Sequence, residues 1–239
     1  MLQGILIINL NRRPDRLQSL LQFIQGSDLA TVSIYRLAAH DGSTINYTDG
    51  LLTPQALYEL EQLRIKGFRD FHAQLSVGAI GCYLSHVDAW KFIAENSGAD
   101  DTAPYLILED DAEVPPAVME AIAKAWKAST LESAGKPFIL LAHIICLSGC
   151  GKRTDGMIIP ERFWSFQAYL INGKTAKALL EAGMFPIDVQ IDSQILYYRN
   201  AGILNVYAYK IMADAATDTD IQVNIRANAP LDRFKMLTL

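Results

Sequence analysis

Tyr105-Leu106-Ile107-Leu108 runs directly into Glu109-Asp110-Asp111, and the interpretation of the chain starts from this stretch. A short apolar run with polar residues on both sides is typical of a strand buried on both faces of a sheet. Three adjacent carboxylates repel one another, and each raises the pKa of its neighbours. The sequence therefore predicts a central strand that delivers a costly cluster of negative charge to one edge of a sheet.

Apolar runs and helical patterns alternate on both sides of this stretch. Residues 4–8 form a second continuous apolar run, after which Pro14 and Asp15 suit the first turn of a helix that Gly26 can end. The pattern predicts further strands at 32–37, 138–142, 168–171 and 203–209, helices at 53–67, 78–96, 115–131, 175–182 and 188–200, and a glycine-rich loop at 146–160. This alternation predicts an α/β fold with a mainly parallel central sheet.

Length and composition narrow the class of protein. With 239 residues we expect one domain over 1–239, with a core over 4–212 and a polar, weakly patterned tail over 213–239. The net charge of -5 argues against a general nucleic-acid-binding protein, which needs clustered basic charge. Three cysteines favour reduced thiols, and no apolar stretch approaches the ~20 residues of a membrane span. These features predict a cytoplasmic protein without a transmembrane segment.

Polar residues follow two of the predicted strands, at the sheet edge where α/β proteins bind ligands. Asn9 to Arg13 follow the first strand, and the acidic triplet follows the strand at 105–108. Carboxylate and phosphate oxygens are the ligands that Mg²⁺ and Mn²⁺ prefer. Alternation along the strand would put Glu109 and Asp111 on one side and Asp110 on the other. The residues alone also allow a solvated acidic turn that caps the helix expected near residue 115.

Other candidate residues have a structural and a functional reading each. Arg12, Arg13 and Arg16 could meet a pyrophosphate or could form a solvated helix face. Ser85 and His86 lie on the helix expected at 78–96, where a single histidine is usually structural. The thiol-containing sets Cys82 with His86, and His143 with Cys146 and Cys150, fall short of the four ligands of a structural zinc site.

Asp188 and Asp192 are four residues apart and would share a face of the helix expected at 188–200. They could supply a general base, or Asp188 could cap that helix with Asp192 in its first turn. The chain has no Gly-x-Ser-x-Gly elbow, Walker A loop or Rossmann glycine fingerprint. Hydrolases of the elbow type, P-loop enzymes and typical dehydrogenases are therefore disfavoured.

Four segments, taken in order, resemble glycosyltransferase family 25, which includes bacterial lipooligosaccharide galactosyltransferases and collagen galactosyltransferases. The resemblance covers residues 4 to 195 or so. It departs at Ala79, where an acidic residue is common, and in the tail, where Asp218-Thr219-Asp220 is only a loose match. The segments are Ile7-Ile8-Asn9-Leu10 with Arg12-Arg13-Pro14-Asp15-Arg16, Gly78-Ala79-Ile80-Gly81-Cys82-Tyr83-Leu84-Ser85-His86, Leu108-Glu109-Asp110-Asp111, and Ala168-Tyr169-Leu170-Ile171 with the later Pro186-Ile187-Asp188 and Asp192.

The resemblance implies a GT-A type nucleotide-sugar-binding fold, a UDP-sugar donor such as UDP-galactose, and Mn²⁺ or Mg²⁺ on the diphosphate. It also implies inverting transfer to a carbohydrate or lipid-linked acceptor such as lipooligosaccharide. A lipid-linked acceptor would require peripheral contact at the inner membrane face, for which the sequence shows no polybasic helix. We expect Asp188, or else Asp192, as the base. We expect Asp111 to hold the metal together with Glu109, or else with Asp110. We expect the donor pocket to use Asn9, Leu10, Arg12, Arg13, Arg16, Ser85, His86 and Asp110.

Two other functions stay open on the sequence. The chain could be a non-catalytic nucleotide-sugar-binding or scaffold protein, although three retained carboxylates are costly for a protein that no longer uses them. It could also be a sugar-phosphate nucleotidyltransferase, a class that also uses acidic metal clusters. The absence of glycine from residues 9–16 weighs against that class, which usually carries a glycine-rich loop after the first strand.

Overall fold

The fold centres on an eight-stranded mixed sheet with strand order β2-β1-β3-β8-β5-β9-β7-β6. The computed structural model describes residues 2–47, 50–98, 101–130, 133–142, 151–152, 154–160, 163, 166–209, 211–214, 225 and 229–230. The strands are β1 (Gly4–Asn9), β2 (Ile34–Ala38), β3 (Tyr105–Glu109), β5 (Pro137–Leu140), β6 (Gly151–Lys152), β7 (Ile158–Ile159), β8 (Ala168–Ile171) and β9 (Asn205–Ala208). A separate pair joins β4 (Ala112–Glu113) to β10 (Ala213–Asp214).

The strands confirm the α/β class and add a feature that the sequence pattern did not show. β1 is parallel to β2 and β3, and β5 is parallel to β9. β8 lies between β3 and β5 and is antiparallel to both. The short antiparallel pair β6–β7 lies in the segment expected as a glycine-rich loop. The sheet is therefore mixed, and the parallel strands β1, β2 and β3 form one end of it.

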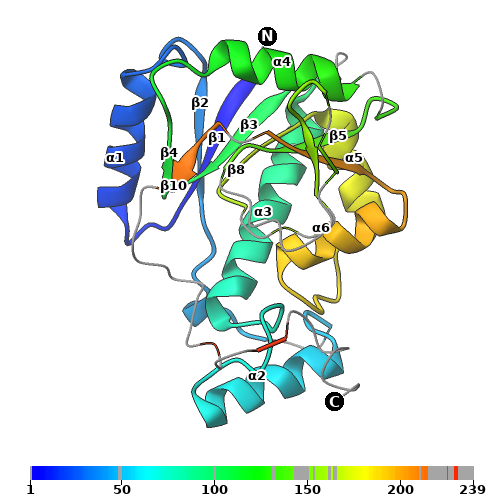
Figure 1. Ribbon diagram of the computed structural model, residues 1–239. Helices are drawn as coiled ribbons and strands as arrows, with labels where there is room; N and C mark the ends of the chain where they lie inside the picture. Colours follow the sequence, from blue (N-terminus) through cyan, green and yellow to red (C-terminus); the bar gives the residue numbers. More distant parts are fainter. Residues whose placement is uncertain are drawn as a thin grey trace.

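Helices cover both faces of this sheet (Figure 1). Alternate residues of β1 belong to two different cores, with Leu6 and Ile8 packed on one side and Ile5 and Ile7 on the other. α3, α5 and α6 contribute to the first core, whereas α1 and α4 contribute to the second. The helices are α1 (Pro14–Gln25), α2 (Pro54–Lys66), α3 (Val77–Asn96), α4 (Met119–Thr130), α5 (Gly173–Glu181) and α6 (Ile191–Asn200), with a short 3-10 helix η1 (Gly42–Thr44).

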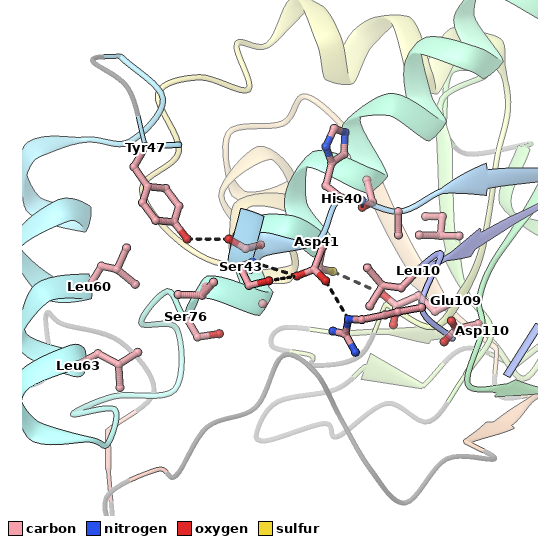
Figure 2. A pocket seen from close by; sticks show the side chains of 18 of the residues that line it. Leu10, His40, Asp41, Ser43, Tyr47, Leu60, Leu63, Ser76, Glu109 and Asp110 are labelled. Atoms are coloured by element: carbon pink, nitrogen blue, oxygen red, sulfur yellow. Dashed lines mark hydrogen bonds and ion pairs between the residues drawn. The ribbon is translucent and has the colours of Figure 1, made fainter. Parts of the chain in front are cut away.

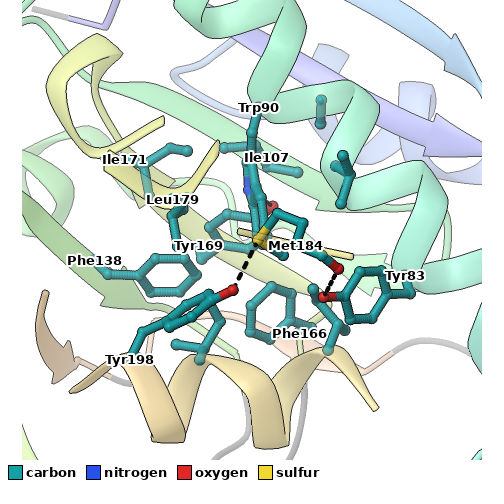
Figure 3. Close-up of a cluster of buried hydrophobic side chains, with 14 of the residues drawn as sticks. Tyr83, Trp90, Ile107, Phe138, Phe166, Tyr169, Ile171, Leu179, Met184 and Tyr198 are labelled. Carbon is teal, nitrogen blue, oxygen red and sulfur yellow. Dashed lines mark hydrogen bonds between the residues drawn. The ribbon is translucent and has the colours of Figure 1, made fainter. Parts of the chain in front are cut away.

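A buried aromatic cluster fixes α3 on the sheet (Figure 3). Phe138 of β5 stacks on Tyr169 of β8 with ring centroids 4.8 Å apart. Trp90 of α3 donates its indole N–H to the Tyr169 hydroxyl over 2.9 Å. A buried Trp or Tyr needs such a partner for its polar atom, so this contact sets where α3 crosses β8.

Two helices begin later than the sequence pattern predicts, and each shift has a physical cause. α4 begins at Met119 instead of near 115, because the Asp28 carboxylate accepts hydrogen bonds from the Val118 and Met119 amides over 3.1 and 3.0 Å. α6 begins at Ile191 instead of 188, because Ile187 forms a bridge with Leu52. The expectation that Asp188 and Asp192 share a helix face is therefore wrong.

The loop after β2 packs against the start of α3 through two glycines. A Cβ atom on Gly42 would lie 1.9 Å from the Val77 carbonyl oxygen, and one on Gly81 would lie 2.4 Å from the His40 carbonyl oxygen. Only residues without a side chain allow this backbone approach. The two glycines therefore place the residues after β2 beside the first turns of α3.

None of the described helices combines the length and apolar composition that a membrane crossing requires. The segment His143 to Cys150 lies outside the described residues, so its expected ligand set has no structural outcome. The same holds for most of the tail, including Asp218, Thr219 and Asp220.

Candidate functional site

A pocket of 880 Å³ opens where β1 and β3 end, between these strands and α2. In Figure 2, Leu60, Leu63 and Tyr47 lie on one side of it, and Glu109 and Asp110 lie on the other. The pocket thus has a wall from α2 that is mostly apolar but also carries the Glu61–Arg64 ion pair, and an acidic wall from the end of β3. The wall from α2 is called the apolar wall below. Its other lining residues include Leu10, Arg12, Arg16, His40, Asp41, Ser43, Leu57, Ser76, Val77, Cys82, Ser85 and Asp111.

Asp110 connects the end of β3 to the end of β1 and to α1. Its carboxylate accepts a hydrogen bond from the Asn9 amide over 2.7 Å and pairs with Arg16 over 3.2 Å. Asn9 also donates to the Arg13 carbonyl over 2.8 Å and accepts from the Arg36 guanidinium over 3.0 Å. Asn9 is buried and does not line the pocket. Its amide therefore holds the loop after β1 in place through the hydrogen bonds to Arg13 and Asp110.

Glu109 is held from the side of α3. Its Oε1 lies 2.9 Å from His86 Nε2 and accepts a hydrogen bond from the Cys82 thiol over 3.4 Å. The other ring nitrogen of His86 lies 2.9 Å from the Tyr169 hydroxyl, which also accepts from Trp90. His86 is fully buried and lies behind Glu109, outside the pocket lining, and burial raises the pKa of the Cys82 thiol. The orientation of Glu109 is therefore fixed by a buried chain of polar contacts.

Asp111 differs from its two neighbours because one of its oxygens lacks a protein partner. Oδ1 is buried and accepts no hydrogen bond from any described residue. Burial, followed by repulsion from Glu109 and Asp110, raises the pKa of Asp111 to about 7. An ionised carboxylate in this position is costly unless a cation approaches it. Since Asp28 caps α4, the triplet does not act as the cap for that helix.

Arg12 and Asp41 form an ion pair on the pocket wall, with Nε and Oδ2 2.8 Å apart. Hydrogen bonds from Ser43 and the charge of Arg12 lower the pKa of Asp41 to about 2. Ser85 ties this loop to α3, because its hydroxyl accepts from the His40 amide over 2.9 Å and donates to the Gly81 carbonyl over 2.7 Å. His40, Asp41 and Ser43 line the pocket but are not among the residues predicted from the sequence. Their position just after a predicted strand is the signal that could have indicated them.

The two candidate bases lie in different surroundings, and neither lines the pocket. Asp188 accepts a hydrogen bond from the Thr53 hydroxyl over 2.5 Å, and Thr53 caps the start of α2. Asp192 lies in the first turn of α6. Burial raises the pKa of Asp192 to about 6, and the charge of Glu109 adds to this shift. Asp192 is therefore electrostatically coupled to the acidic wall.

The structure divides the predicted site residues into two groups. Arg13 is half-buried and pairs with Asp15 over 2.9 Å, away from the pocket lining. The residues that do not line the pocket are Asn9, Arg13, His86, Asp188 and Asp192. The predicted residues that line it together are Leu10, Arg12, Arg16, Ser85, Glu109, Asp110 and Asp111.

The sequence of this chain matches one family model and several curated proteins. The model of Glycosyltransferase family 25 (LPS biosynthesis protein) matches residues 2–195. "Putative glycosyltransferase R655" of Acanthamoeba polyphaga mimivirus is 30% identical over 52% of this chain and 33% of that protein. "Glycosyltransferase 25 family member" of Drosophila melanogaster is 29% identical over 48% of this chain and 17% of its own length. "Procollagen galactosyltransferase 2" of Homo sapiens is 29% identical over 45% of this chain and 15% of its own length. The chain thus spans a third or less of these relatives.

Proposed function

The chain belongs to glycosyltransferase family 25, and we propose that it is an inverting, metal-dependent enzyme that moves galactose from UDP-galactose to a carbohydrate acceptor. The observation that carries this proposal is the buried, unpartnered oxygen of Asp111 beside Glu109, on the wall of a pocket of 880 Å³. Galactose is supported by the name of the human relative, a procollagen galactosyltransferase. The size of the pocket suits a nucleotide sugar, since ligand sites commonly measure roughly 300–1,000 Å³.

The residues of the acidic wall fit a hard divalent cation such as Mn²⁺ or Mg²⁺. Asp111 would bind it through the unpartnered oxygen, and Glu109 through Oε2, because Oε1 already faces His86 and Cys82. Such ions take carboxylate and phosphate oxygens. When bound, the ion stabilises the negative charge of the departing diphosphate. Asp110 is committed to Asn9 and Arg16, which makes it a positioning residue of this wall.

The donor is proposed to lie along Leu10, Arg12 and Arg16, at the start of α1. Arg16 is mostly buried and paired with Asp110, so its charge is held beside the acidic wall where a diphosphate would lie. Positive charge near that point offsets the repulsion between carboxylates and phosphate oxygens. Arg12 is oriented by Asp41 of the loop after β2. Ser85 of α3 holds that loop through its hydrogen bond with the His40 amide.

For the base that takes a proton from the acceptor hydroxyl, the surroundings favour Asp192 over Asp188. A carboxylate whose pKa is raised toward neutrality is a better proton acceptor at the pH of the reaction. Burial raises the pKa of Asp192 in this way. Asp188, by contrast, accepts the hydroxyl of Thr53 and so stabilises the start of α2. Asp192 does not line the pocket, but its charge acts on Cys82 and Glu109, which do. We therefore propose Asp192 as the base and Asp188 as a structural residue.

The apolar wall supports an acceptor that carries an apolar portion, such as a glycolipid of the lipooligosaccharide type. Leu60 and Leu63 of α2 line the pocket on the side away from the carboxylates (Figure 2), and Leu57 of the same helix also lines it. Apolar walls with a few placed polar groups are typical of sites for amphipathic ligands. An acceptor of this kind would bring the protein to a membrane surface by peripheral contact.

The direct test measures UDP release from UDP-galactose in the presence of Mn²⁺, with UDP-glucose as a comparison donor. Wild-type protein should release UDP from UDP-galactose faster, and chelation with EDTA should abolish release. Asp111→Asn should lose both transfer and Mn²⁺-dependent UDP binding, because the unpartnered carboxylate oxygen is gone. Normal UDP binding without any transfer would indicate a binding or scaffold protein. Release of pyrophosphate from UTP and a sugar phosphate would indicate a nucleotidyltransferase.

A further inference from the structure

Cys82, His86 and Glu109 bring three different metal-binding atoms together at the acidic wall of the pocket, with His86 buried behind the other two. Their ligand atoms all lie within 4.8 Å of one another. Glu109 Oε1 lies 3.4 Å from Cys82 Sγ and 2.9 Å from His86 Nε2. Atoms bound to one tetrahedral Zn²⁺ lie about 3.3 to 3.6 Å apart, given Zn–S bonds of ~2.3 Å and Zn–N bonds of ~2.0 Å. The Cys82–Glu109 separation falls within this range. The His86–Glu109 separation is that of a hydrogen bond, so these two atoms must move apart slightly when an ion enters between them.

We propose that Cys82, His86 and Glu109 bind a thiophilic divalent cation such as Zn²⁺, at a position different from the hard-cation site at Asp111. Thiolate and imidazole ligands select Zn²⁺, whereas an all-oxygen set selects Mn²⁺ and Mg²⁺. Glu109 belongs to both ligand sets, through Oε1 here and through Oε2 at the hard-cation site. An ion on Oε1 therefore neutralises the carboxylate charge that the hard cation needs and repels that cation at short range. Zn²⁺ at this position is therefore an inhibitor of the transfer reaction.

The support around these ligands is already built for metal binding. Cys82 and His86 are one turn apart on α3, so their side chains lie on the same face. His86 Nδ1 faces the Tyr169 hydroxyl at 2.9 Å, and Tyr169 is fixed by Trp90 and by stacking on Phe138. Metal-binding histidines commonly donate their second N–H to such a partner, which sets the tautomer and the ring orientation.

Access is from the pocket. Cys82 and Glu109 line the pocket and His86 does not, so an ion reaches Nε2 by entering between the other two ligands. Binding forms a metal–sulfur bond and breaks the S–H bond of Cys82, whose proton leaves to solvent. His86 binds through Nε2, so the proton that Nε2 directs at Glu109 in the metal-free protein shifts to Nδ1, where it is donated to the Tyr169 hydroxyl. Three protein ligands leave a fourth position on the pocket side for water or an oxygen of a bound ligand.

The binding test uses Cd²⁺, whose bond to a thiolate gives an ultraviolet charge-transfer band. Because the chain has three cysteines, the background protein carries Cys146→Ser and Cys150→Ser, so that Cys82 is the only thiol. The band should saturate at one ion per chain. Glu109→Gln and, separately, His86→Gln should each weaken binding at least tenfold, because second and third ligands are lost. Asp111→Asn should bind Cd²⁺ normally.

Two outcomes would overturn the proposal. One is the absence of a band in the background protein, and the other is unchanged Cd²⁺ affinity in Glu109→Gln, which would mean that the thiol binds alone. Glu109 lies at the pocket edge, so this variant keeps the test decisive if His86→Gln does not fold. This binding test does not depend on the proposed transferase activity and remains informative if that activity is absent.

The inhibition test does rest on the proposed function. Zn²⁺ added to the Mn²⁺-supported reaction should inhibit the wild-type protein. Cys82→Ser should raise the half-inhibitory Zn²⁺ concentration at least tenfold, with each rate expressed relative to the zinc-free rate of the same variant. Equal half-inhibitory concentrations would show that Zn²⁺ acts elsewhere, for example by replacing Mn²⁺ at Asp111.

Discussion

Replacing Asp111 with asparagine should stabilise the metal-free protein at neutral pH, although it removes a residue proposed for catalysis. Asn has nearly the same shape, but it has no charge to bury. The pKa of Asp111 is raised from 3.8 to about 7 by burial and by its two acidic neighbours. At about 1.4 kcal/mol per pKa unit, this shift corresponds to a ceiling of about 4 kcal/mol. Since the three carboxylates share one electrostatic penalty, about 2 kcal/mol is the more realistic gain.

The sign of the effect depends on pH. A carboxyl whose pKa is higher in the folded state than in the unfolded chain binds more protons when folded, so ionisation destabilises the fold. The cost is absent below about pH 4, grows as the pH rises toward 7, and is complete above that value. In EDTA at pH 7.5, Asp111→Asn should therefore exceed wild type by about 2 kcal/mol, or roughly 4–8 °C in Tm. At pH 4 the two proteins should be equally stable.

The assay is urea unfolding at both pH values, followed by thermal unfolding with Mn²⁺. Glu113→Gln is the matched control, because it removes the same charge from an exposed neighbour of the triplet. This control should unfold like wild type at both pH values and keep its stabilisation by Mn²⁺. Asp111→Asn should lose that stabilisation. If Asp111→Asn is less stable than wild type at pH 7.5 in EDTA, the carboxylate has a partner that offsets its burial, and the argument for a cation site fails.

The remaining predictions concern the base, the pocket scaffold and the donor site. Asp192→Asn should lower the transfer rate about 100-fold or more while UDP binding is kept, and the wild-type rate should rise with pH through about 6. Asp188→Asn should mainly lower Tm, because Asp188 supports the start of α2. Equal losses of transfer rate in the two variants would reject this division of roles. Gly81→Ala should lower the free energy of unfolding, measured by urea titration, by about 1–3 kcal/mol, because its Cβ would lie 2.4 Å from the His40 carbonyl oxygen. Gly26→Ala is the control and should be nearly neutral, because the nearest atom to its Cβ would lie 3.4 Å away. Arg16→Met should raise the KM for the UDP-sugar about tenfold or more and leave the apolar wall unaffected; an unchanged KM in steady-state kinetics would place the diphosphate elsewhere.

Local patterns in the sequence were enough to predict most elements and the position of the acidic wall. The apolar run at 4–8 predicts a strand that is buried on both faces, and the structure confirms this for β1. Thr53 and Gly67 were expected to bound a helix, and they cap α2 at its two ends. Periodicity and caps depend on residues a few positions apart, so they can be recognised along the chain.

Which residues face one another could not be obtained in this way. Glu109 meets His86 across 23 positions, His86 meets Tyr169 across 83, and Arg16 meets Asp110 across 94. The contact between His86 and Tyr169 depends on the insertion of β8 between β3 and β5, and the apolar pattern of β8 does not reveal its direction. An apolar strand buried on both faces looks the same whether it runs parallel or antiparallel to its neighbours.

The acidic triplet illustrates where the boundary lies. That three carboxylates follow a buried strand, and stand at a sheet edge where ligands bind, could be inferred from the chain order alone. Their different roles required the tertiary structure: Asp110 is paired with Asn9 and Arg16, Glu109 is held by His86, and one oxygen of Asp111 has no partner among the described residues. Charge and spacing are properties of the sequence, whereas desolvation and pairing depend on which distant side chains the fold brings within hydrogen-bonding distance.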